Sequence, residues 1–140
     1  MAGPATPDLA GIVNLVGRLM EAIARADATA VDVARAAGTD VRDDGAPLGV
    51  RTPADVPGVE QVSVTRQWGG EVPNAAAIAL AAGVSLPQLE AHLGAARPVP
   101  SVRPGEQLVV LGGADGDATT LAALDASGDV RTITVRRETA

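Results

Sequence analysis

The chain of 140 residues contains no cysteine, phenylalanine, tyrosine or lysine, and its single large aromatic residue is Trp68. Without cysteine it cannot form a disulfide, a thiolate zinc site or a cysteine nucleophile. With so few aromatic residues, the core has to be built from leucine, valine, isoleucine and alanine, which bury less area per side chain. We therefore expect a packed fold of ordinary stability at best.

Long hydrophobic runs are missing as well. No segment approaches the roughly 18 consecutive apolar residues of a membrane-spanning helix. The N-terminal segment Met1–Asp8 lacks the basic residues and the unbroken apolar stretch of a secretion signal. These absences predict a cytoplasmic protein.

The charge balance is acidic, with 17 acidic residues against 11 arginines, a net charge of −6 and a pI near 4.6. Nucleic-acid surfaces and anionic membranes both select a basic footprint, so we expect neither as a partner. The use of arginine alone, with much alanine, glycine, proline and valine, is typical of GC-rich bacterial coding. A hydrophobic fraction of 46% is enough for one folded domain over residues 1–140.

Three segments have helical patterns. Apolar residues at helical spacing predict a helix over residues 7–25. The segments Thr29–Gly38 and Ser85–Gly94 then share one design. In each, a hydroxyl residue that favours the helix N-cap is followed three residues later by Asp32 or Gln88, which completes a capping box, and a glycine ends the helix.

In the first half, alternating residues predict a half-buried strand over residues 59–68, and residues 68–73 are typical of a hairpin tip. A short edge strand is expected near residues 48–52. Residues 74–82 are alanine-rich, which favours a helix. The analogous segment of the second half, residues 130–138, has a strand pattern, so we predict a strand over Ala75–Ala81.

In the second half, residues 94–106 are rich in proline and predict a loop that includes Pro98. Strands are expected over residues 107–111, 119–126 and 131–137, with a hairpin turn at Ser127–Asp129. Arg131, Arg136 and Arg137 predict either a charged edge strand or, as an alternative, contact with an acidic partner.

These elements form two similar units, residues 29–82 and 85–138, each a helix followed by three strands. The predicted class is therefore α+β, with helices packed on one face of an antiparallel sheet and an internally duplicated helix–three-strand unit. The other face of such a sheet is open and is a natural contact surface.

The pattern of Ser85, Leu89, Leu93 and Gly94, followed by the turn Ser127–Val130, resembles the tandem-repeat fold of the beta-lactamase inhibitory proteins and the related small outer-membrane lipoproteins. The resemblance extends over about residues 29–138. It implies an architecture and, from that, a module that binds another protein through its sheet. The functional aromatic residues of that family have no counterparts here, so no site residues follow from it.

No catalytic motif is recognisable. His92, the only histidine, is expected on the exposed side of a short helix, and Asp115 and Asp117 are expected in a hairpin loop rather than a calcium site. The glycine pairs do not lie between a strand and a helix, as a phosphate-binding loop requires. We therefore expect no catalytic residue, no metal and no cofactor.

Trp68, with its neighbours Arg66 and Glu71, is the candidate binding group, because tryptophan and arginine are enriched at interface hot spots. Core packing is the competing interpretation of Trp68. The leading hypothesis is a non-enzymatic protein-binding module, for example an inhibitor or immunity-type partner. A self-associating structural subunit, or a small enzyme or ligand-binding domain with a cavity between helices and sheet, are the alternatives.

Overall fold

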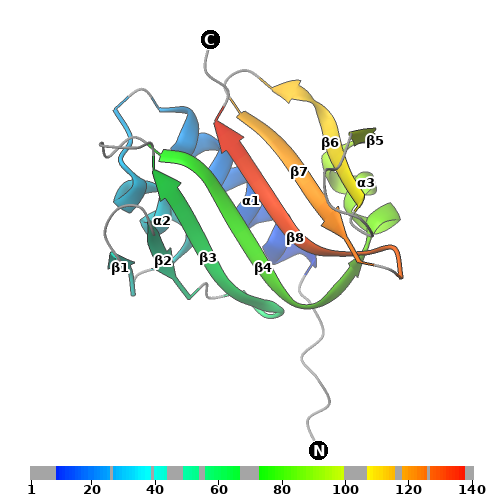
Figure 1. Cartoon of the computed structure of the whole chain (residues 1–140), viewed down its shortest axis with the longest axis horizontal. Helices are drawn as coiled ribbons and strands as arrows, with labels where there is room; N and C mark the ends of the chain where they lie inside the picture. The colour runs from blue at the N-terminus through cyan, green and yellow to red at the C-terminus, as the bar shows by residue number, and fades with distance from the viewer. Residues whose placement is uncertain are drawn as a thin grey trace, which may run out of the picture.

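A computed structural model describes residues 9–25, 27–38, 40–43, 49–53, 56–66, 73–99, 107–115, 118–125 and 127–137. Within these ranges, three helices pack on one face of an eight-stranded antiparallel sheet (Figure 1). The predicted α+β class, with helices on one face of an antiparallel sheet, is confirmed.

The first helix, α1 (Leu9–Ala24), forms the centre of the helical layer. It packs against β4, β7 and β8 of the sheet and against both other helices. One side of α1 is apolar at helical spacing and is buried, which is why the periodicity of the sequence located this helix. Its buried residues are Ile12, Leu15, Val16, Leu19, Ala22 and Ile23.

The second helix, α2 (Ala30–Ala37), has the predicted capping box. The Asp32 backbone N–H donates to Thr29 Oγ1 at 3.2 Å, and the Thr29 N–H donates to Asp32 Oδ2 at 3.1 Å. Gly38 ends this helix with extended backbone. This reciprocal pair satisfies two of the backbone donors that a helix N-terminus leaves unbonded.

The third helix, α3 (Leu86–Leu93), begins and ends where the sequence predicted, but the capping box at Ser85 is wrong. Ser85 makes no side-chain cap hydrogen bond, because it is still the last residue of a strand and pairs with Asp129 in the sheet. Gly94 does take a positive φ of 103°. The sheet, rather than a side chain, therefore fixes where this helix begins.

The sheet has the strand order β1-β2-β3-β4-β8-β7-β6-β5, and every neighbouring pair is antiparallel. Its strands are β1 (Arg42–Asp43), β2 (Val50–Thr52), β3 (Val59–Arg66), β4 (Pro73–Ser85), β5 (Ala96–Val99), β6 (Gln107–Asp115), β7 (Ala118–Leu124) and β8 (Asp129–Arg137).

The alanine-rich segment 75–81 is a strand, as predicted, and lies within the longest strand of the sheet, β4. Both edges of β4 are paired, with β3 on one side and β8 on the other. Ala76, Ile78 and Leu80 alternate into the core under the helices. Pairing and burial together outweigh the helix propensity of alanine.

Two strands were not predicted. β1 has only two residues, and β5 contains Pro98 in a segment that was predicted to be a loop. β5 is at the edge of the sheet, where a proline removes no ladder hydrogen bond that the fold needs. The prediction of an edge strand for Arg131, Arg136 and Arg137 is wrong, because β8 lies at the centre between β4 and β7.

The two halves contain the same series of elements. α2 precedes β1 to β4, and α3 precedes β5 to β8, so each unit has four strands rather than the predicted three. The strand order is symmetric about the central β4–β8 pair. Duplication of the unit remains a prediction.

Two glycines give a matched pair of tests of the packing. A Cβ atom on Gly38 would lie 2.3 Å from the Pro53 carbonyl oxygen, whereas a Cβ on Gly17, in the middle of α1, meets nothing within 4 Å. We predict that Gly38→Ala destabilises the fold by about 1–3 kcal/mol through this clash. Gly17→Ala should stabilise it by about 1 kcal/mol through helix propensity. Urea unfolding measures both, and equal effects of the two substitutions would contradict the packing of α2 against β2.

The β7–β8 turn is organised by one carboxylate. Asp125 Oδ1 accepts the N–H of Ser127 at 2.9 Å and of Asp129 at 3.1 Å, and its Oδ2 accepts Arg131 Nε at 3.1 Å. Gly128 takes a positive φ of 84° in this turn, which was predicted at Ser127–Asp129. The hydrogen bond from the Asp129 backbone is the main reason that the pKa of Asp125 lies below its ordinary value of 3.8, with Ser127 and Arg131 adding to it.

Because the pKa of Asp125 is lowered by folding, its ionised form stabilises the hairpin above the unfolded pKa, and that contribution is lost as the pH falls through the folded pKa. We predict that Asp125→Asn is less stable than the parent chain at neutral pH. The difference should shrink as the pH is lowered from neutral through the folded pKa of Asp125, in urea unfolding curves recorded over a series of pH values. Asp27→Asn is the control, because Asp27 makes no hydrogen bond or ion pair within the described residues. A stability difference for Asp125→Asn that does not change with pH would contradict this assignment.

Candidate binding surface

The face of the sheet that points away from the helices carries the candidate site, which we call the open face (Figure 1). Strand pairing places one continuous row of side chains across all eight strands of this face. The row is Arg42, Arg51, Ser63, Ala77, Thr134, Leu121, Val110 and Arg97. An arginine lies at each end of the row, Arg42 on β1 and Arg97 on β5.

Two shorter rows flank this one. On one side lie Gln61, Ala79, Thr132, Ala123, Leu108 and Val99. On the other side lie Thr65, Ala75, Arg136 and Thr119. Except for Thr119, all of these side chains are half-buried or exposed, while on the central strands β3, β4, β8 and β7 the alternate residues, such as Val62, Ile78, Ile133 and Ala122, face the core.

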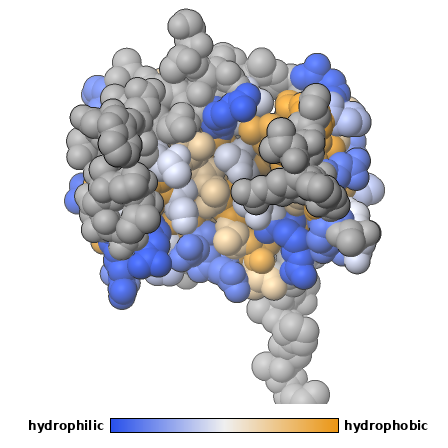
Figure 2. Space-filling view, in the orientation of Figure 1, coloured by the Kyte–Doolittle hydropathy of each residue, from blue (hydrophilic) through white to orange (hydrophobic). Residues whose placement is uncertain are grey.

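The middle of the open face is made of small side chains. β4 contributes only alanine to these rows, and the adjoining strands β3 and β8 contribute serine, threonine, Gln61 and Arg136. Towards β5 the surface becomes more apolar, with Leu108, Val110 and Leu121 all half-buried. Figure 2 shows pale and light orange atoms in the middle of this face and blue atoms towards its margins.

The three rows contain four arginines and no carboxylate, in a chain whose net charge is −6. Without these four positive charges the remainder of the chain has a net charge of −10. Arg51 and Arg136 already take part in polar or electrostatic contacts of their own chain. Arg42 and Arg97, at the two ends of the long row, are exposed.

The size of the open face suits a protein contact. Residues on the same face are about 6.8 Å apart along a strand, and neighbouring strands are about 4.8 Å apart. Each position therefore covers the product of these two spacings, and the 18 positions of the three rows together cover roughly 600 Å². A partner of equal footprint would bring the total to about 1,200 Å², the lower end of the range for specific protein interfaces.

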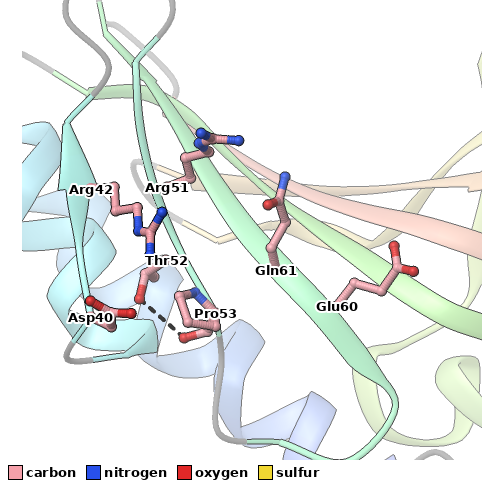
Figure 3. A pocket seen from close by; sticks show the side chains of 7 residues that line it. All are labelled: Asp40, Arg42, Arg51, Thr52, Pro53, Glu60 and Gln61. Atoms are coloured by element: carbon pink, nitrogen blue, oxygen red, sulfur yellow. Dashed lines mark hydrogen bonds between the residues drawn. The ribbon is translucent and has the colours of Figure 1, made fainter.

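A polar hollow of about 230 Å³, which we call the edge hollow, lies at the β1–β2–β3 end of this face (Figure 3). It is lined by Asp40, Arg42, Arg51, Thr52, Pro53, Glu60 and Gln61. Arg42 and Arg51 are direct partners on neighbouring strands, an arrangement of like charges that costs stability. Within the described part of the chain, the side chains of Asp40, Arg42 and Glu60 form no hydrogen bond or ion pair with one another or with other described residues.

Of the binding residues predicted from sequence, only the backbone of Arg66 can be placed. Arg66 is the last residue of β3 and pairs with Pro73. Its side chain, and the whole of Trp68 and Glu71, lie outside the described residues. His92 is exposed in the last turn of α3, as expected.

The arginines of the open face were not identified from the sequence, except for Arg136, for which contact with an acidic partner was one interpretation. Arg51 and Arg97 lie on β2 and β5, strands too short to give a periodicity in the sequence. Only the register of the sheet shows that both lie on the same face as Arg42 and Arg136.

No group of three or more histidine, aspartate or glutamate side chains that could hold a metal ion occurs within the described residues. Within the same residues, none of the helices has the length and apolar character needed to cross a bilayer.

No protein-family model and no curated protein matches the sequence. A solved structure with a similar fold was found. It is the crystal structure of YjgB from Bacillus subtilis, a DUF4309 family protein, with a TM-score of 0.61 over 93% of this chain and 97% of that chain. The two sequences are 12% identical, so the likeness concerns the fold alone.

Proposed function

We propose that this protein is a non-enzymatic protein-binding module that recognises a partner protein through the open face of its sheet. The observation that carries the proposal is the composition of that face. It has an interior of alanine, threonine and leucine, four arginines, and no carboxylate in its three rows.

The chemistry of the face defines the partner. A partner with an apolar centre would bury the small side chains of β4 and β8 together with Leu108, Val110 and Leu121. Acidic groups near its margin would lie opposite Arg42 and Arg97. Arginine is enriched in protein interfaces, and complementary charge speeds association and selects partners. An inhibitor or an immunity-type partner is a role that fits such a surface.

The open face also supports a contact role better than a catalytic one. The side chains of its rows are alanine, leucine, valine, serine, threonine, glutamine and arginine, and their flat arrangement does not enclose a substrate. On the opposite face, the inward side chains of α1 such as Leu15 and Leu19 are fully buried against the sheet.

The test uses the absence of cysteine from the chain. Thr132→Cys on the open face and Asn14→Cys on the exposed side of α1 each receive a photo-crosslinker, and both proteins are irradiated in extract of the source organism. We predict that a defined partner protein is crosslinked from position 132 and not from position 14. Adding Arg42→Glu and Arg97→Glu to Thr132→Cys should lower the yield about tenfold or more, since each reversal replaces attraction by repulsion.

Control variants with Arg18→Glu and Arg35→Glu, on the helical side, change the net charge equally and should leave the yield unchanged. A crosslinked second copy of this chain would support the self-associating subunit instead. Equal crosslinking from positions 132 and 14, or a yield that is insensitive to Arg42 and Arg97, would contradict the proposal.

A further inference from the structure

A second hollow lies on the outer side of the helical layer, on the opposite side of the molecule from the open face. It has a volume of about 310 Å³ and lies between α1 and α2; we call it the helix groove. α1 contributes Arg18, Glu21 and Ala22, and Arg25 follows directly after its last residue. α2 contributes Asp32, Arg35 and Ala36.

The groove exists because its floor is made of small side chains. Ala22 is almost completely buried at 7% exposure, and Ala36 is half-buried beside it. Larger side chains at these positions would fill the space between the helices. The charged groups of the groove lie on the exposed sides of the two helices, above the two alanine methyl groups.

The arginines of the groove lie near carboxylates but form no ion pair with them within the described residues. Glu21 is three residues after Arg18 and four before Arg25, which are the spacings that favour ion pairs along a helix. Nevertheless, within the described residues neither of these arginines, nor Arg35, forms an ion pair. The three guanidinium groups therefore have donors available for another molecule.

The second carboxylate of the groove, Asp32, already forms a hydrogen bond within its own chain. It accepts the Thr29 N–H in the capping box at the start of α2. This backbone hydrogen bond is the largest cause of the lowered pKa of Asp32, and the positive charges of Arg35 and Arg25 lower it further. Three arginines and two carboxylates leave the groove with one net positive charge, in a protein whose net charge is −6.

We propose that the helix groove binds a phosphate group, free or as a soluble phosphomonoester, through Arg18, Arg25 and Arg35. A guanidinium group presents a planar fork of donors that matches phosphate oxygens, and clusters of arginine are a recurring means of phosphate recognition. Arg18 lies on α1, and Arg25 directly follows the last residue of that helix, Ala24. Arg35 approaches from α2, so a phosphate group between the helices can meet guanidinium groups from both. This site is separate from the open face and does not depend on the proposed partner.

The experiment is a titration of the isotope-labelled protein with sodium phosphate at neutral pH and low ionic strength, followed by the NMR shifts of the Ala22 and Ala36 amides. We expect these shifts to saturate with a single dissociation constant. Arg35→Gln and Arg25→Gln should each weaken binding about tenfold, as expected for loss of a charged hydrogen bond. A parallel titration with glycerol phosphate distinguishes free phosphate from a phosphomonoester as the ligand. If glycerol phosphate binds more tightly than inorganic phosphate, the groove recognises a monoester.

Two further variants separate binding in the groove from a general effect of charge. Glu21→Gln removes a negative charge beside the site and should tighten binding about threefold, whereas Glu60→Gln on the other side of the molecule makes the same change and should have no effect. Ala36→Met fills the groove without changing any charge and should weaken binding. Shifts that do not saturate would overturn the proposal. So would equal weakening by Arg35→Gln and by Arg97→Gln on the open face, or unchanged binding in the Ala36→Met variant. Circular dichroism of each variant shows that it is folded.

Discussion

The structure depends on the burial of one face of the β4–β8 pair beneath α1. β4 and β8 meet at the centre of the sheet and join the two halves of the chain. Ile78 and Ile133 are direct partners in this pair, and both are fully buried on the helical side. α1 belongs to neither half and lies across this junction, where it contacts both strands. Aliphatic side chains of modest size fill this core. Its stabilising free energy therefore depends on close packing of these side chains rather than on the burial of large aromatic rings.

This arrangement also determines what is left exposed. The three helices α1, α2 and α3 all cover the same face of the sheet. On the central strands, alternate residues therefore face outward. On β4 the side chains at these positions are all alanine. The two sides of the molecule consequently carry different chemistry. The open face combines apolar side chains with arginine, while the helix groove is a polar hollow between two helices.

Local signals in the sequence predicted the local structure well. The periodicity of α1, the capping box of Thr29 and Asp32, and the turn at Gly128 each depend on neighbouring residues, and all three are present. β1 and β5 were missed because strands of two and four residues have no measurable periodicity, and Pro98 indicated a loop. The charged segment of β8 was placed at an edge because composition alone does not reveal the order of strands.

The candidate surface was only partly predictable for the same reason. A sheet with helices on one side implies an open face, and this followed from the pattern of elements. Which arginines share that face depends on the register of seven strand pairings, and no local pattern encodes that register. Arg42 and Arg97 lie at opposite ends of one row, and they share a face only through the pairing of all eight strands.

The most direct test of this account is whether one face of the central strands is accessible in the free protein. Because the chain has no cysteine, Thr132→Cys and Ile133→Cys give neighbouring thiols on opposite faces of β8. The account predicts that a water-soluble thiol reagent labels position 132 rapidly and labels position 133 at least about a hundredfold more slowly, since the core thiol reacts only when the fold opens. Equal labelling rates at the two positions, or protection of position 132, would contradict it.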